Sequence, residues 1–214
     1  MDAVIDNLPR FIDGFLMTLR LLVISGAGAL VLGTVVAALR ISPVAAFRVF
    51  AMVYTEIVRN IPLTLVLFFC AFILPYLGAP VDYVQFAIIG LTVYTSPFVA
   101  EAIRSGVNGV AVGQAEAARA IGLGFSQTLG SVVLPQAIRM VIPPLINVII
   151  ALTKNTSVAA GFAVVELVAT GRQVIQFAGN AIPIFIAIAV LYLLITVPLG
   201  RIAALLEKKL AVLR

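Results

Sequence analysis

The sequence predicts an all-α integral membrane protein with about five transmembrane helices. Of its 214 residues, 63% are hydrophobic and only 11% are charged, and the mean hydropathy of +1.19 is far above that of a water-soluble domain. A bilayer core of roughly 30 Å needs about 20 apolar residues per helix, so this length accommodates roughly five or six spans. We therefore expect a single transmembrane domain, 1–214, without a separate catalytic domain.

The first predicted span covers about Phe15–Leu39 and follows an acidic leader. Asp2, Asp6 and Asp13 stand there against Arg10. This charge pattern is opposite to the basic start of a cleaved signal peptide. We therefore expect the first apolar segment to remain in the protein.

Four further apolar runs follow along the chain. Each has the length and composition of a membrane-spanning helix, and their predicted bounds are about Glu56–Leu77, Tyr83–Ile103, Val132–Leu152 and Ala181–Leu205.

The stretch Ser157–Gln176 is apolar in parts, but Gly161, Glu166, Gly171 and Arg172 interrupt it. Irregular backbone at membrane depth must be lined by protein or water. The stretch therefore suits a short helix or a re-entrant segment better than a lipid-facing span, with a sixth span as the alternative.

Arginine and lysine placement predicts the orientation, because cytoplasmic loops carry the excess of these residues. With the N-terminus outside, three basic residues lie on the outer side, namely Arg10, Lys154 and Arg172. Eight lie on the cytoplasmic side, namely Arg40, Arg48, Arg104, Arg119, Arg201, Lys208, Lys209 and Arg214. We expect a multi-pass protein of the plasma membrane with its N-terminus outside and its C-terminus in the cytoplasm.

Several function classes fit the composition poorly. Histidine is absent and Cys70 is the only cysteine, which removes the commonest zinc and haem ligand sets, so no metal site is expected in this chain. The basic residues are scattered, without the patch that nucleic acid requires. A membrane-embedded enzyme would need clustered catalytic groups. A channel or secondary carrier would need its own gating ions or internal repeats, and the sequence contains no internal repeat.

One polar segment, Gly113–Gly124, interrupts the apolar pattern and falls on the cytoplasmic side. Its alanines favour a helix, with Glu116 near the N-terminal end and Arg119 three residues later. Gly122 and Gly124 are expected to adopt positive φ and end the helix. A short helix with such small side chains suits contact with another protein, whereas an ordinary cytoplasmic loop is the alternative.

The spacing in this segment resembles the EAA loop of ABC importer membrane subunits. That pattern is EAA, three residues, G, nine residues and I-x-L-P, and here Val132 replaces the isoleucine. The matching residues are Glu116, Ala117, Ala118, Gly122, Leu134 and Pro135. The resemblance implies a type I ABC importer permease fold, with a coupling loop at about 113–135.

The resemblance narrows to permeases of the histidine, glutamine and glutamate uptake type. The run YTEIVRNIPL resembles that group's E-x-x-R-x-x-P-L motif. The run VAEAIRSGVNGVAVGQAEAA resembles the group's E-x-x-R-G-G segment and the G-Q-x-E-A-A motif that follows it. The run LPQAIRMVIPPLINVIIALTKNTS resembles its L-P-Q-A to K-D-T-S segment. Ser105 replaces a glycine of the pattern and Asn155 an aspartate.

This resemblance implies partners. A like or identical second permease, two ATP-hydrolysing subunits that bind ATP and magnesium, and an extracytoplasmic binding protein for a polar amino acid are expected. The chain itself has no phosphate-binding loop, because GLGFSQTLG lacks the required lysine, and no cofactor is expected in it. The implied contacts with the ATPase are Gly113, Gln114, Glu116, Ala117, Ala118, Arg119 and Gly122.

A zwitterionic substrate needs polar groups along its route, because an unpaired charge in lipid costs several kcal/mol. The candidates are Asn147, Lys154, Asn155 and Thr156, although Asn147, Lys154 and Thr156 are equally suited to bracing the helix break. Pro143-Pro144 removes two backbone donors and is a candidate gate. Two i, i+3 pairs, Glu56 with Arg59 and Glu101 with Arg104, are expected to neutralise themselves. The motifs do not distinguish glutamate from the related substrates.

Overall fold

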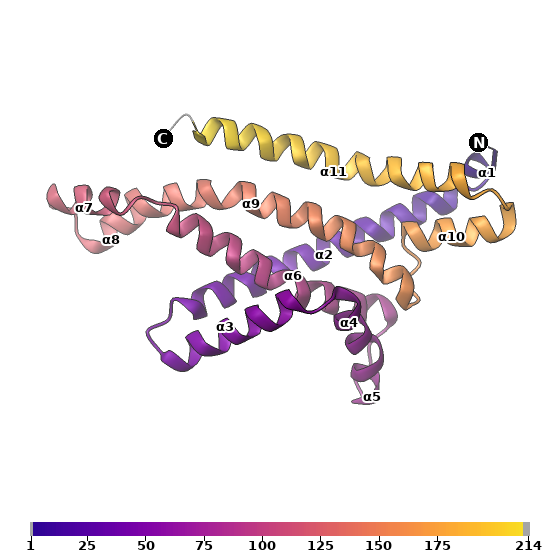
Figure 1. The fold of residues 1–214 in the computed structure, drawn as a ribbon, viewed down its shortest axis with the longest axis horizontal. Coiled ribbons are helices and arrows are strands. Elements are labelled where there is room, and N and C mark those ends of the chain that lie inside the picture. Colours follow the sequence, from indigo (N-terminus) through magenta and orange to yellow (C-terminus); the bar gives the residue numbers. More distant parts are fainter. Residues whose placement is uncertain (1, 212–214) are drawn as a thin grey trace.

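The computed structural model describes residues 2–211, which lie in helices and short connections (Figure 1). The helices are α1 Asp2–Ile5, α2 Leu8–Arg40, α3 Ala45–Asn60, α4 Leu63–Phe68, α5 Leu74–Tyr76, α6 Tyr83–Asn108, α7 Val112–Ala120, α8 Phe125–Gln127, α9 Leu134–Asn155, α10 Leu167–Ala178 and α11 Ala181–Ala211. Two π-helical turns, η1 Phe69–Ile73 and η2 Thr128–Val133, and the 3-10 helix η3 Thr156–Phe162 connect them. The predicted cytoplasmic residue Arg214 lies outside the described residues.

Four helical stretches are long and apolar enough to cross a bilayer. They are Leu8–Arg40, Tyr83–Asn108, Phe125–Phe162 and Ala181–Lys209. A fifth crossing results if α3 and the Leu63–Tyr76 helix are counted as one broken span. The predicted all-helical membrane fold with about five spans is therefore confirmed.

The predicted second span, Glu56–Leu77, has the wrong start. Its first residues belong to α3, and α3 is bent by 106° relative to the helix that follows. Pro62 causes the break, because it has no backbone donor and forces the preceding residue out of helical geometry. Ile61 accordingly has φ −96° and ψ 149°.

The core is built around the crossing of α2 and α6. Gly33 on α2 lies so close to α6 that an added Cβ would stand 2.6 Å from the carbonyl oxygen of Ser96. At Gly28 the corresponding contact is with the Thr92 hydroxyl, at 2.9 Å. Small residues at such positions allow the close backbone packing that holds membrane helices together.

The proline inside α6 shows how its neighbour α3 is attached. Pro97 cannot donate a backbone hydrogen bond to Val93. The free carbonyl of Val93 instead accepts hydrogen bonds from the Tyr54 hydroxyl, at 2.9 Å, and from the Ser96 hydroxyl, at 3.1 Å. Because Tyr54 belongs to α3, the side chain that satisfies α6 also binds α3 to it.

The stretch Ser157–Gln176 contains no lipid-spanning helix of its own. Ala163, with φ 59°, ends η3 in the left-handed region, and α10 follows with only 12 residues. A helix of that length covers about 18 Å, less than the bilayer core. This is the short helix favoured by the sequence over a sixth span.

The two ends of the molecule carry different elements. The short helices α1 and α10 lie at one end, with the starts of α2 and α11, whereas α7, α8 and the last turns of α11 lie at the opposite end (Figure 1). The polar segment is thus separated from α1 and α10 by the length of the long helices (Figure 1).

Candidate functional site

The polar segment forms the helix α7 and projects from one end of the molecule. Its implied contact residues are exposed, except for Ala118, which is buried at 5% exposure. Three large apolar side chains beside them, Val112, Ile121 and Phe125, are 73%, 80% and 69% exposed. The surface of α7 and its flanks therefore combines small polar residues with apolar ones that this chain does not cover.

The end of α7 is a left-handed glycine cap. Gly122 has φ +90°, its N–H donates to the Arg119 carbonyl at 2.9 Å, and the Leu123 N–H donates to the Ala118 carbonyl at 3.1 Å. These two bonds form a Schellman motif, which satisfies carbonyls at the helix end. The predicted positive φ of Gly122 is confirmed.

The same expectation for Gly124 is wrong. Its φ is −68°, because it is the N-cap residue of α8 and not part of the α7 cap. The Gly124 N–H donates to the Gln127 side-chain oxygen at 3.0 Å. One left-handed residue is enough to reverse the chain here, and the second glycine begins the next helix.

The substrate-pathway candidates occupy two kinds of environment. Asn147 and Lys154 are exposed on α9, two turns apart and on the same face. Thr156 is fully buried, and its hydroxyl donates to the Thr153 carbonyl at 2.7 Å. Thr156 thus braces the end of α9, while Asn155, half-buried, ends the helix beside it.

A buried polar cluster around Glu166 lies next to this helix end. In the sequence, Glu166 appears only as a charged residue that interrupts the apolar stretch Ser157–Gln176. Glu166 has 0% exposure and caps α10 by accepting from the Ala169 N–H at 2.8 Å. Its other oxygen accepts from the Tyr192 hydroxyl at 3.0 Å and, more weakly, from the Thr18 hydroxyl at 3.5 Å. The carboxyl group therefore joins α10 to both α2 and α11.

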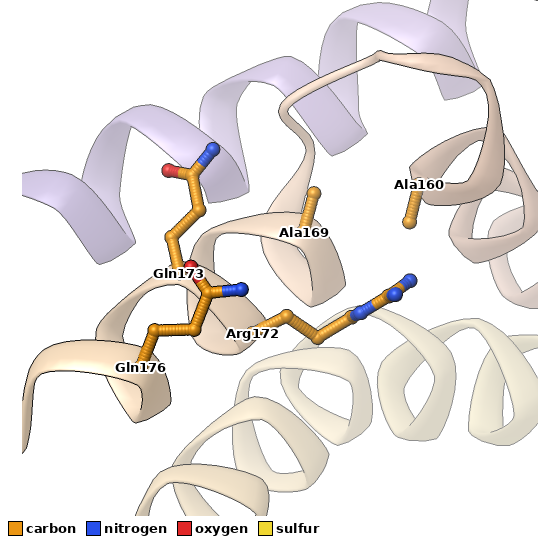
Figure 2. Close-up of a pocket in the computed structure, with 5 residues that line it drawn as sticks. All are labelled: Ala160, Ala169, Arg172, Gln173 and Gln176. Carbon is orange, nitrogen blue, oxygen red and sulfur yellow. The ribbon is translucent and has the colours of Figure 1, made fainter. Parts of the chain in front are cut away.

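A small pocket of about 180 Å³ opens between η3 and α10 (Figure 2). The methyl groups of Ala160 and Ala169 form one side, and Arg172 extends beneath them with the amides of Gln173 and Gln176 nearby. The pocket is far along the chain from α7 and lies at the opposite end of the molecule (Figure 1).

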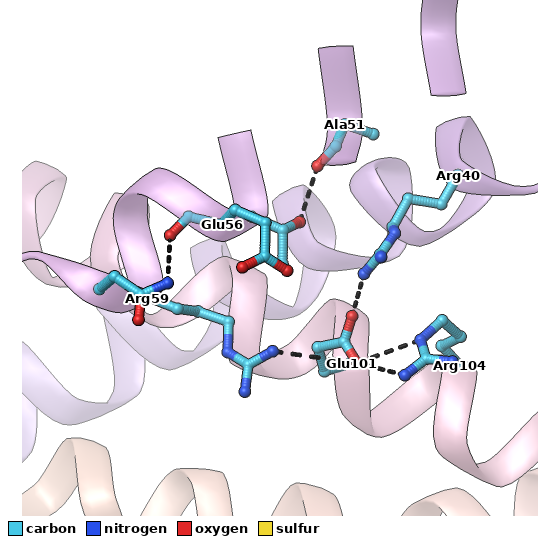
Figure 3. A network of polar contacts seen from close by, with 8 residues as sticks. Arg40, Ala51, Glu56, Arg59, Glu101 and Arg104 are labelled. Carbon is cyan, nitrogen blue, oxygen red and sulfur yellow. Dashed lines mark hydrogen bonds and ion pairs between the residues drawn. The ribbon is translucent and has the colours of Figure 1, made fainter. Parts of the chain in front are cut away.

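The most extensive ionic cluster surrounds Glu101 on α6 (Figure 3). The predicted pair with Arg104 is present, with nitrogen–oxygen distances of 2.7 and 3.1 Å. Arg40, the last residue of α2, pairs with the other carboxylate oxygen. Arg59 of α3 lies 4.0 Å from Glu101 and stacks over the Phe98 ring, 5.6 Å from its centroid.

The other predicted pair, Glu56 with Arg59, is wrong. All ion pairs found among the described residues involve Glu101, and Figure 3 shows the Arg59 guanidinium turned toward that residue. Sequence spacing reveals neighbours on one helix, but Arg59 finds its partner on α6. No clustered metal-ligating side chains occur in residues 2–211.

Comparison with known proteins agrees with this architecture. Residues 29–212 match the family described as "Binding-protein-dependent transport system inner membrane component". The chain is 41% identical to the glutamate transport system permease protein of Corynebacterium efficiens, over 95% of both chains. It is also 41% identical to a probable glutamine ABC transporter permease protein of Bacillus subtilis, over 96% of this chain and 95% of the relative.

Solved structures show the same fold. An amino acid ABC transporter crystallised with histidines superposes with a TM-score of 0.90 at 26% identity, over 96% of both chains. The methionine ABC transporter MetNI in an inward-facing conformation gives a TM-score of 0.76 at 21% identity, which bears on the fold alone. The chain therefore belongs to the binding-protein-dependent transport system inner membrane component family and is the membrane-spanning permease subunit of an ABC importer, not an enzyme.

Proposed function

We propose that this permease moves a polar amino acid, glutamate or a related one, across the plasma membrane. An extracytoplasmic binding protein delivers the substrate, and two partner subunits bind ATP and magnesium and hydrolyse the ATP. The observation that carries the proposal is α7, an exposed helix of small side chains that a left-handed glycine closes. The names of the glutamate and glutamine relatives support the substrate class.

The coupling contact is assigned to the exposed residues of this segment. Gly113, Gln114, Glu116, Ala117 and Arg119 present small or polar groups on α7, which a groove on the ATPase subunit can approach closely. Ala118 and Gly122 act differently, because Ala118 packs inside the loop and Gly122 sets the direction of the chain. Val112, Ile121 and Phe125 supply the apolar area that such an interface needs.

The substrate route is assigned to the exposed face of α9. Asn147 and Lys154 lie on that face, and Asn155 follows Lys154 directly. Because Asn147 and Lys154 are uncovered within this chain, this face of α9 suits a path between two permease subunits, homologous or identical. Thr156 contributes by holding the helix end, as its hydrogen bond to Thr153 indicates.

The decisive experiment replaces Gly122 by valine in the complete transporter, reconstituted with its ATPase subunits and binding protein. A β-branched residue is strongly disfavoured at φ +90°, so the direction of the loop after α7 should change. We expect uptake to be lost and hydrolysis no longer to respond to the loaded binding protein.

Gly200→Val is the matched control. Gly200 lies in α11, outside the coupling loop, has no positive φ and has nothing within 4 Å of an added Cβ, so this variant should retain uptake. Wild-type uptake and stimulation in Gly122→Val would show that α7 is not the coupling element.

A further inference from the structure

We propose that Glu101 is a positioning residue for coupling, through which movement of α7 reaches α2 and α3. The inference rests on the proposed function, since it assumes that α7 contacts the ATPase subunits. It assigns to Glu101 a role beyond neutralising its neighbour Arg104, namely that of the common counterion of three helices.

The geometry places one carboxylate between three elements (Figure 3). One oxygen pairs with Arg40 at the end of α2, and the other lies 4.0 Å from Arg59 of α3. The side chains of Glu101 and Arg40 are each only 19% exposed. Water and salt screen such a partly buried pair less than a surface pair, so it can hold two helices in register.

The cytoplasmic end of α6 is in turn packed against α9 and joined to α7 by a short connection, and α7 packs against η2, which leads into α9. A Cβ on Gly106 would lie 2.9 Å from the backbone nitrogen of Val141, so α6 and α9 approach almost backbone to backbone. Only residues 109–111 separate α6 from α7. Glu101 stands about 10 Å before the end of α6, so a displacement of α7 that shifts this end also shifts Glu101.

The charge balance explains why the carboxylate is needed. Arg40, Arg59 and Arg104 bring three positive charges to one negative charge. Without the carboxylate, the guanidinium groups of α2, α3 and α6 would repel one another, and the three helices would no longer move together. Removing one partner of a partly buried ion pair leaves the charge of the other partner uncompensated.

Glu56 offers a matched control within the same chain. It has the same i, i+3 spacing to an arginine as Glu101, but it is exposed and has no ion pair in the described part of the chain. Glu56→Gln removes the same charge with the same change of shape. Only the links between helices differ between the two variants.

The test measures substrate molecules taken up per ATP hydrolysed, in proteoliposomes that contain the complete transporter and its binding protein. For Glu101→Gln we expect this ratio to fall about 2- to 30-fold, the range of energetic coupling carried by single residues. The amount of assembled complex should stay the same. Glu56→Gln should keep the wild-type ratio.

Two arginine variants separate a link between helices from local neutralisation. Arg40→Gln breaks the bond between α2 and α6 and should lower the ratio as Glu101→Gln does, and the double variant should be no worse than Glu101→Gln alone. Arg104→Gln removes a pair within one helix and should lower it less. If Glu101→Gln does not assemble, Arg40→Gln alone decides.

A wild-type ratio in Glu101→Gln or, failing that variant, in Arg40→Gln would overturn the inference, as would an effect of Arg104→Gln equal to that of Arg40→Gln. If Gly122→Val uncouples hydrolysis while Glu101→Gln does not, this inference fails and the proposed function stands. If Gly122→Val behaves as wild type, the proposed function fails first.

Discussion

At the scale of single residues, Ala117 and Ala118 show how burial separates two neighbours in one motif. Both are alanines of α7, but Ala117 is exposed and Ala118 is buried at 5% exposure. A larger side chain at Ala117 meets only what another protein brings to the surface. A larger side chain at Ala118 must displace atoms of this chain.

The two positions should therefore fail differently when each is replaced by leucine. Ala118→Leu overpacks the inside of the loop and should lower the stability of the permease by about 1–3 kcal/mol. Ala117→Leu should leave the isolated permease unchanged and weaken only its association with the ATPase subunits. Thermal unfolding of the purified permease, followed by co-purification with the ATPase, measures both effects. Equal loss of thermal stability in the two variants would contradict the assignment.

At the scale of elements, the crossing of α2 and α6 depends on glycine. Gly33 faces Ser96 and Val99 at distances that leave no room for a methyl group, since a Cβ would lie 2.6 Å from a backbone oxygen and from the Val99 Cβ. The backbone oxygen cannot move aside without shifting α6. The position of α6, and with it that of α7, thus depends on residue 33 being a glycine.

Gly33→Ala should consequently lower the temperature at which the permease unfolds, because the two helices must separate to accept the methyl group. Overpacking typically costs about 1–3 kcal/mol. Gly200→Ala on α11, where nothing lies within 4 Å of an added Cβ, is the matched control and should unfold at or above the wild-type temperature. The prediction is wrong if the two variants unfold at the same temperature.

Sequence reasoning located the elements whose signal is local. The apolar runs identified α2, α6, α9 and α11, and the spacing of EAA and Gly122 identified α7. It missed α3 as a separate helix, because the run continues across Ile61 and only the backbone restriction at Pro62 reveals the break. Long-range contacts were equally hidden, since Arg40 and Glu101 are 61 positions apart.

At the scale of the whole molecule, much apolar surface remains uncovered. On α11, Ile182, Phe185 and Leu194 are 73%, 51% and 61% exposed. A membrane helix can expose such residues to lipid or to a second permease. Asn147 and Lys154, which are exposed on α9, fit contact with a second permease better than contact with lipid, because a polar group facing lipid is costly. The family's assembly from several subunits is consistent with this surface.

The orientation of the whole chain is testable with two cysteines. The positive-inside rule places α7 and α8 in the cytoplasm and the turn between α10 and α11 outside, and these elements lie at opposite ends of the long helices (Figure 1). Ser126 on α8 and Asn180 after α10 are both exposed.

In a Cys70→Ala background, Asn180→Cys should react with a membrane-impermeant maleimide added to intact cells, whereas Ser126→Cys should react only after the membrane is opened. The native Cys70 is buried, and it is replaced so that any label reports the introduced cysteine alone. Labelling of Ser126→Cys in intact cells, with none at Asn180→Cys, would show that the chain has the opposite orientation in the membrane. The proposed coupling helix would then face away from the ATP-hydrolysing subunits and could not act on them.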